Sequence, residues 1–337
     1  MTPVEEIELP SRAQFEAELR PLYRPLVIRG AALHWSIVDP PSDREGRQER
    51  LLAAIERFDS GAQTDIMVAP PEAKGRFFYT PDVRGFNFRR ERASLSQLAQ
   101  LLGKLIDDPN PPAVYAGAAA AGQHLPGFEA NNPFELVEPG QSAARIWLGN
   151  ATQVATHFDL SDNFAVVVEG KRRFTLFPPD TIDDLYVGPL DVTLAGQPVS
   201  MVDPLAPDLE RYPRFARAQD RALVTELEPG DAIYIPTLWW HHVTASAQVN
   251  MLVNYWHNDA QHGGGFVAMV HAVMSIRDLP QPQREAWKSW FDHMVFAPEA
   301  PRSADHIPDP ARGVTGPPSP ERDARIRQFI ARVLTRS

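Results

Sequence analysis

The sequence predicts a mainly β protein: an antiparallel sandwich or barrel in the middle of the chain, preceded by a mixed α/β segment and followed by helices. Three observations predict this fold. Between about residues 112 and 257, short apolar runs alternate with glycine and proline separators. Proline makes up 33 of the 337 residues, about twice its usual share of ~5%, which disfavours a bundle of long helices. After residue 262, apolar residues recur at helical spacing.

Composition and charge exclude several classes of protein. The chain carries 33 Lys and Arg against 43 Asp and Glu, a formal net charge of -10, which disfavours binding to the phosphate backbone of nucleic acid. The absence of cysteine excludes disulfides, thiolate metal ligands and a cysteine nucleophile. The first residues lack the pattern of a signal peptide, and no apolar run approaches the ~18 residues of a membrane helix. We therefore expect a cytoplasmic protein without nucleic-acid or membrane partners.

The first third of the chain, residues 1–111, is expected to form an α/β elaboration of the core. Ser11 is a suitable cap for a helix that reaches about Leu22, and residues 25–30 have the pattern of a short buried strand closed by glycine. The remaining predicted elements are helices over residues 46–58 and 94–106, the second capped by Ser94, and strands over residues 64–68 and 76–79.

Residues 112–260 are expected to form the strand-rich core. Its separators include Pro-Pro and Pro-Gly pairs, which end strands and begin turns. One long, proline-containing insertion, about 178–215, interrupts the pattern. Loops of that length inside a compact domain are usually functional, so we expect this one to help bind the substrate. The predicted strands cover residues 113–116, 144–148, 163–168, 173–177, 231–235 and 249–256.

The last segment, 261–337, is expected to be helical. Helices are predicted over residues 266–276, 281–296 and 321–335, the last following a Pro-, Ala- and Asp-rich linker. In the second helix Trp287, Trp290 and Phe291 repeat at helical spacing. Such a stripe is more often core than a cofactor contact, and we expect it to be packed in the core. The alternative is a homodimer interface, because little sequence remains for the stripe to pack against.

Two histidines and one carboxylate are the strongest candidates for chemistry. His157 and Asp159 stand in Thr-His-Phe-Asp, and because side chains alternate along an extended segment, both project to one face. His241 follows an apolar strand and two tryptophans. Two histidines and one carboxylate on one face of a metal leave about three coordination positions open, which suits non-haem Fe(II). His-x-Asp alone is a weak signal that usually marks a surface strand. The surrounding motifs therefore decide whether this pair is interpreted as a metal site.

Those motifs cover residues 144–256. They are His157-Phe-Asp159, Asn163, Gly170-Lys-Arg-Arg-Phe-Thr-Leu-Phe-Pro-Pro179, Leu185-Tyr186, Pro229-Gly-Asp-Ala-Ile-Tyr-Ile-Pro236, Trp239-Trp-His241 and Asn254-Tyr-Trp256. In this order they resemble the JmjC-type, cupin-like Fe(II) and 2-oxoglutarate-dependent oxygenases, most closely the branch containing the asparaginyl hydroxylase of hypoxia-inducible factor. The resemblance implies a double-stranded β-helix, or jelly roll, in which His157, Asp159 and His241 bind Fe(II). It also implies 2-oxoglutarate as cosubstrate.

The cosubstrate pocket departs from the family at one central position. The resemblance implies a lysine that pairs with the distal carboxylate of 2-oxoglutarate, and Arg172 stands in its place. Alternation points Arg172 inward with Phe174 and Leu176, and sends Lys171 and Arg173 outward. Arginine binds a carboxylate through a two-pronged fork, so binding is expected to survive. The alternative is that Arg172 pairs with a buried acid of the protein and the pocket is lost.

Other positions match the family to different degrees. Val154 replaces a threonine that relatives tend to carry near the same carboxylate. The resemblance assigns Tyr115, Asn163 and Asn254 to binding the cosubstrate, although Tyr115 is equally compatible with a core tyrosine and the amides with tying down strands. His242 is expected to point away from the metal if its segment is extended.

The resemblance implies hydroxylation of an unactivated C–H bond, coupled to decarboxylation of 2-oxoglutarate to succinate. The substrate is either a protein side chain or a small molecule, with specificity expected in residues 77–90 and 178–215. The alternative function, motivated by Arg172 and Val154, is a cupin-fold metal-binding or regulatory protein that has lost 2-oxoglutarate turnover. A metal-dependent cupin isomerase or dioxygenase without 2-oxoglutarate is less compatible, because such sites commonly use more histidines.

Overall fold

The computed structural model describes residues 1–38, 46–258 and 264–334. The chain divides into two compact units, Met1–Asn258 and Asp259–Ser337, which are described separately. The expected core boundary at residues 260 and 261 lies outside the described residues, as does residue 335 of the last predicted helix. The segment that precedes residue 112 contributes strands to both sheets of the first unit.

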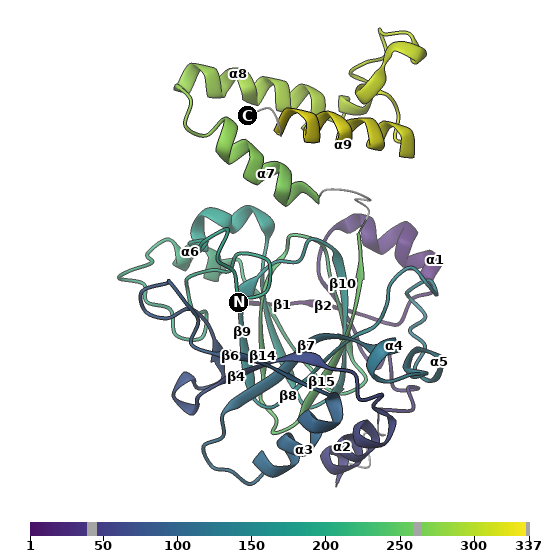
Figure 1. The fold of residues 1–337 in the computed structure, drawn as a ribbon, viewed down its shortest axis with the longest axis vertical. Coiled ribbons are helices and arrows are strands. Elements are labelled where there is room, and N and C mark those ends of the chain that lie inside the picture. Colours follow the sequence, from purple (N-terminus) through teal and green to yellow (C-terminus); the bar gives the residue numbers. More distant parts are fainter. Residues whose placement is uncertain (39–45, 259–263, 335–337) are drawn as a thin grey trace. The chain divides into compact units, whose positions relative to one another are not determined.

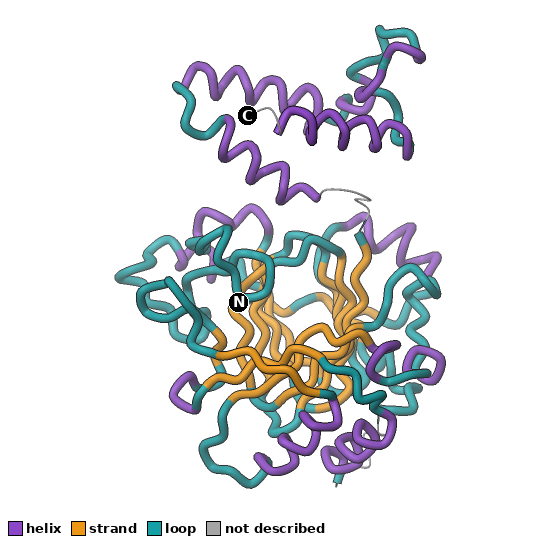
Figure 2. The backbone as a smooth tube through the Cα atoms, viewed as in Figure 1, coloured by secondary structure: helices purple, strands orange, loops and turns teal. Residues whose placement is uncertain are grey.

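Two facing β-sheets form the centre of the first unit, as Figures 1 and 2 show. Most neighbouring strands are antiparallel, and this arrangement is the jelly roll of cupin-like proteins. The six-stranded sheet contains, in spatial order, β1 (Thr2–Pro3), β12 (Leu223–Leu227), β11 (Arg172–Phe177), β14 (Trp240–Ala245), β9 (Thr152–His157) and β5 (Arg76–Phe77). The nine-stranded sheet contains β2 (Glu5–Ile7), β3 (Leu26–Ile28), β13 (Ala232–Ile235), β10 (Asp162–Glu169), β15 (Asn250–His257), β8 (Arg145–Gly149), β7 (Ala113–Ala120), β4 (Thr64–Ala69) and β6 (Arg89–Ala93).

The six strands predicted in the core are all present. Successive side chains along these strands point to opposite faces of the sheet and so contribute to two separate hydrophobic cores. In β10, Ala165 and Val167 face the six-stranded sheet and pack in the core between the sheets. Phe164 and Val166 face the other way and pack in a larger core on the outer face. The strands β10, β13 and β15 are therefore buried on both faces over most of their length, which explains their largely apolar sequences.

Helices cover the outer face of the larger sheet. The helices α2 (Arg47–Phe58) and α3 (Leu95–Leu105) pack against each other and against β7, β8 and β10. The predicted cap of α3 is confirmed, because Ser94 and Gln97 form a reciprocal capping box. The first predicted helix is short and irregular: α1 (Arg12–Gln14), capped by Ser11, continues as a π-turn, Phe15–Leu19, and a 3-10 turn, Arg20–Leu22. The other short helices of this unit are α4 (Ala121–His124), α5 (Phe128–Asn131) and α6 (Phe215–Asp220).

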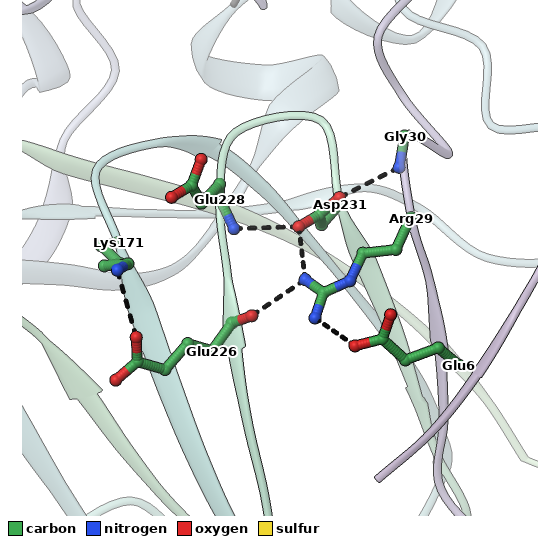
Figure 3. Close-up of polar contacts among 7 residues, drawn as sticks. All are labelled: Glu6, Arg29, Gly30, Lys171, Glu226, Glu228 and Asp231. Carbon is green, nitrogen blue, oxygen red and sulfur yellow. Dashed lines mark hydrogen bonds and ion pairs between the residues drawn. The ribbon is translucent and has the colours of Figure 1, made fainter. Parts of the chain in front are cut away.

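The N-terminal strands close one edge of each sheet. β1 pairs with β12 of the smaller sheet and β2 pairs with β3 of the larger, while Val4 between them is buried in the core between the sheets. Arg29 anchors this arrangement, as Figure 3 shows. Its guanidinium donates to Glu6 at 2.5 Å, to Asp231 at 2.7 Å and to the carbonyl of Glu226 at 2.9 Å. These bonds join the N-terminal strands to the turn between β12 and β13.

The C-terminal unit contains α7 (Gly264–Ser275), α8 (Gln281–Phe291) and α9 (Pro320–Leu334), close to the predicted bounds. A π-turn, Asp292–Phe296, extends α8. The expectation that its aromatic stripe is packed in the core is wrong, because Trp287 is 45% exposed and Trp290 is 63% exposed. In the described part of this unit, Ala300 and Ala304 are the only buried apolar residues. No helix in the described part of the chain is both long enough and apolar enough to cross a membrane.

Candidate active site

The three predicted metal ligands converge at one end of the smaller sheet. His157 ends β9, Asp159 follows two residues later, and His241 lies directly opposite His157 on β14. Their ligand atoms all lie within 4.8 Å of one another, and the two imidazole rings are 4.3 Å apart. Leu238 adopts a left-handed backbone conformation, with φ of 64°, and its N–H donates to the carbonyl of Asp159 at 2.9 Å. This strained turn joins the two segments that carry the ligands.

Each histidine presents the nitrogen that a metal requires. The Nδ1 of His157 lies 2.9 Å from the carbonyl of Ala155, and the Nδ1 of His241 lies 3.0 Å from the carbonyl of Trp239. A carbonyl only accepts, so both Nδ1 atoms carry the proton and both Nε2 atoms keep a lone pair. Burial, followed by the nearby His157, lowers the pKa of His241 to about 4, which keeps its ring neutral at neutral pH.

Hydrogen bonds hold the carboxylate of Asp159 in place. Its Oδ2 accepts from the Nδ2 of Asn163 at 2.9 Å and from the indole N–H of Trp256 at 3.2 Å. Asn163 is fixed in turn by Asn254, whose Nδ2 donates to the Oδ1 of Asn163 at 2.5 Å. Such partners orient a ligating carboxylate and restrict its rotation. Asn163 and Asn254 thus support Asp159, and the expectation that they bind the cosubstrate stays a prediction.

Arg172 is a buried cation on the same inward face. It is 7% exposed, and its Nε is buried without a hydrogen-bond partner in the described structure. The predicted alternation is confirmed, because Lys171 and Arg173 are about half-exposed and pair with Glu226. The alternative acid partner is not found, since Arg172 forms no ion pair with any described residue. Burial lowers the pKa of Arg172 to about 10, so the group still carries its charge at neutral pH.

Strand register sets the distance between this cation and the metal ligands. Across β11, β14 and β9, Leu176 aligns with His241 and His157, whereas Arg172 aligns with Ala245 four residues away. Four residues of strand span roughly 13 Å. An elongated ligand with a polar group at each end would therefore be needed to contact both the triad and Arg172. Position 170, just before β11, requires glycine, because a Cβ there would lie 2.2 Å from the side-chain amide oxygen of Asn250.

Val154 and Tyr115 also project between the two sheets. A β-bulge in β9 lets Val154 face inward although it is three residues before His157, and it packs in the core between the sheets. Tyr115 is buried in β7, which raises its pKa to about 12, and lies close enough to Arg172 for their charges to interact. Its ring stacks on Trp147 at a centroid distance of 6.0 Å. A role for Trp147 could not be predicted from the sequence, because its ring contacts Tyr115 and Trp256 on other strands.

The two segments expected to set specificity meet beside His157. Residue Ser200 of the insertion donates its N–H to the carbonyl of Thr156 at 2.8 Å, continuing the sheet past β5 along the same edge of β9. Tyr79 donates to the carbonyl of Val192 at 2.5 Å, and Arg76 pairs with Asp203 at 3.6 Å. The insertion is therefore ordered next to the triad. The contacts of Tyr79 with Val192 and of Arg76 with Asp203 join residues more than a hundred positions apart, so no local pattern could predict them.

His242 points away from the triad, as the alternation predicts. It lies opposite Thr175 on β11 and is not among the residues that could share a metal ion. Burial is the main reason that its pKa falls to about 4, with the charges of Asp203 and Arg76 acting in opposite directions. A neutral, buried histidine that packs against β11 is consistent with a structural role.

A jelly roll that brings two histidines and one carboxylate to one end of a sheet is the architecture of cupin-like metal proteins. Residues 12–262 match the family described as the cupin-like domain. The chain therefore belongs to this cupin-like, JmjC-type family.

The chain is similar to several characterised relatives. It is 29% identical over 262 residues to the human bifunctional peptidase and (3S)-lysyl hydroxylase JMJD7, covering 70% of this chain and 77% of that protein. It is 29% identical over 266 residues to the mouse tRNA wybutosine-synthesizing protein 5, covering 72% and 74%. A shorter match, 32% identical over 123 residues, covers 35% of this chain and 24% of the human HSPB1-associated protein 1.

Proposed function

We propose that the chain is an Fe(II) and 2-oxoglutarate-dependent oxygenase that hydroxylates its substrate. The observation that carries this proposal is the buried, unpartnered guanidinium of Arg172 on the face that also presents the triad. A buried cation without an acid partner is unfavourable unless a ligand supplies the anion. The set of two histidines and one carboxylate fits Fe(II), and the span to Arg172 fits a dicarboxylate.

The residues of the site have different roles in this reaction. When bound, the ferrous ion and 2-oxoglutarate supply decarboxylation to succinate coupled to transfer of one oxygen atom to a substrate C–H bond. His157, Asp159 and His241 would hold the metal through two neutral nitrogens and one oriented carboxylate. Arg172 would hold the distal carboxylate of 2-oxoglutarate. The buried apolar side chains around His241 and Arg172 would limit the access of water to the bound reactants.

The relatives support the hydroxylase family and leave the substrate class open. One is named as a lysyl hydroxylase and peptidase, and another for tRNA wybutosine synthesis. For this chain we favour a protein side chain or a small molecule, because a net charge of -10 opposes binding to a polyanion such as tRNA. Membership of the asparaginyl hydroxylase branch stays a prediction.

The second candidate is a cupin-fold metal-binding or regulatory protein that has lost 2-oxoglutarate turnover. Val154 favours it, because an apolar side chain lies between the triad and Arg172 where the resemblance implies a hydroxyl. Fe(II)-dependent release of succinate from 2-oxoglutarate by the purified protein separates the two candidates. Metal binding without 2-oxoglutarate binding would support the second candidate and contradict the first.

We also propose that the C-terminal unit forms a homodimer. Its exposed apolar residues exceed what a small helical unit tolerates in water. They include Val267, Met274, Trp290, Phe296 and Phe329, which are between 62% and 71% exposed. A second copy supplies the same apolar surface in a closed, symmetric contact.

Sedimentation or light scattering should therefore give a dimer at micromolar concentration. Trp290→Glu should shift the mass to that of a monomer, because it places a charge in the apolar interface. Arg277→Glu, at an exposed charged position of the same unit, is the matched control and should leave the dimer intact. A monomeric wild-type protein would contradict this proposal.

A further inference from the structure

A second arginine faces the interior from the opposite sheet. Arg145 begins β8 and lies directly opposite Asn254 of β15. Side chains of directly opposed residues project to the same face of a sheet, and Asn254 projects inward toward Asn163 and Asp159. Arg145 therefore points to the face that carries the triad's supporting bonds. Trp147, two residues later, shares this face.

Solvent reaches this face of β8 more readily than the opposite face. The outward-facing Ile146 and Leu148 are fully buried against the helices, whereas Arg145 and Trp147 are partly exposed. Trp256, whose ring meets that of Trp147 edge to face at 6.3 Å, is also partly exposed. The inward side of β8 and β15 is thus accessible next to Asp159.

Three polar groups on this face lack protein partners. The guanidinium of Arg145 forms no hydrogen bond or ion pair with any described residue. The indole N–H of Trp147 is buried without a partner in the described structure, and so is the Oδ1 of Asn254. Three neighbouring side chains therefore offer a cation, a donor and an acceptor that the protein itself leaves unused. Buried polar atoms in this state point to a missing ligand.

The cosubstrate does not account for Arg145. In the proposed function one carboxylate of 2-oxoglutarate lies at the metal and the other at Arg172, which belongs to the six-stranded sheet. Arg145 belongs to the nine-stranded sheet, in the row next to that of Trp256 and Asn163. Both carboxylates of 2-oxoglutarate then have a partner, the metal and Arg172. The positive charge of Arg145 is left without an anion.

We propose that Arg145 binds an anionic group of the primary substrate, with the planar, apolar body of that substrate against Trp147 and Trp256. This inference rests on the proposed oxygenase function and narrows its substrate class to carboxylate-bearing molecules or acidic side chains. A guanidinium binds a carboxylate through two parallel hydrogen bonds, and indole faces pack against planar groups. The anion holds one end of the substrate while the C–H bond to be oxidised lies toward the triad.

The test uses the full-length protein loaded with Mn(II) and 2-oxoglutarate, and two probes that differ in charge alone. Phenylacetate carries the anion, and phenylacetamide is its neutral counterpart. Calorimetric titration should show phenylacetate binding at least about tenfold more tightly, the effect of one charge-assisted contact. Arg145→Gln should remove this difference, and Arg145→Lys should keep part of it. Arg173→Gln, at an outward-facing arginine, is the matched control and should behave as wild type.

Three results would overturn the proposal. The first is equal binding of the two probes by the wild-type protein. The second is an unchanged preference for phenylacetate in Arg145→Gln, whose folding is checked by its melting temperature. The third is a loss of 2-oxoglutarate affinity in Arg145→Gln while the probes still differ, which would assign Arg145 to the cosubstrate. If the wild type fails to bind 2-oxoglutarate, the proposed function fails instead, and the probe comparison with Mn(II) alone still decides the role of Arg145.

Discussion

Replacing Arg172 by methionine should weaken 2-oxoglutarate binding at least about 30-fold and raise the melting temperature of the ligand-free protein. The guanidinium is buried without an acid partner, so its charge destabilises the empty protein. Exchanging buried ions for apolar side chains of similar volume commonly stabilises a protein by roughly 1–4 kcal/mol. Removing one partner of a buried charge pair costs about 2–5 kcal/mol of binding, or between about 30-fold and several thousandfold in affinity.

Calorimetric titration of Mn(II)-loaded protein with 2-oxoglutarate, together with thermal melts, measures both effects. Arg172→Lys keeps the charge and should retain measurable affinity, although it loses the two-pronged fork. Arg173→Met removes a neighbouring, half-exposed arginine and should change neither quantity much. Unchanged 2-oxoglutarate affinity in Arg172→Met would remove this residue from the cosubstrate site. A lower melting temperature would show that an internal partner stabilises the guanidinium.

His157→Ala should weaken metal binding by more than about 100-fold and abolish succinate release. It removes one of three ligands, whereas loss of an outer hydrogen-bond partner alone costs about 10–100-fold. Trp256→Phe removes one such partner of Asp159 and should fall in that lower range. Mn(II) binding is measured from the electron paramagnetic resonance signal of the free ion. This measurement does not depend on turnover.

His242→Ala is the matched control for the metal site. This histidine is adjacent to His241 in sequence but points away from the triad, so its removal should leave metal affinity within about threefold of wild type once folding is confirmed. An equal loss of affinity in His242→Ala and His157→Ala would mean that the metal lies elsewhere. A normal affinity in Trp256→Phe would show that Asn163 alone suffices to orient Asp159.

Much of the core could be predicted from the sequence because its central strands are buried on both faces. β10 and β15 therefore contain the apolar runs 164–168 and 251–253. β6 could not be predicted, since four of its five residues are charged and exposed. The aromatic stripe of α8 was interpreted wrongly, because helical spacing shows that a face exists and does not show whether the same chain covers it.

The site could be predicted where it depends on short-range order and not where it depends on pairing. His157 and Asp159 could be predicted as a pair of ligands because they are close in sequence. His241 could be predicted as the third ligand from the order of the motifs. Trp256 was recognised only as part of a motif, because its bond to Asp159 requires β15 to lie beside β10. The inward position of Arg145 likewise follows from its register with Asn254, which no local pattern contains.

The N-terminal strands also bear on how the folded protein avoids aggregation. Open sheet edges present unpaired backbone groups that recruit further strands. Residues 2–7 occupy one edge of each sheet, and the Arg29 bonds hold them there. At the far edge of the larger sheet, β6 displays Arg89, Arg90, Glu91 and Arg92, whose charges repel an incoming strand. Deleting the first seven residues would thus expose one edge of each sheet. The truncated protein is therefore expected to self-associate, although all three metal ligands are still present.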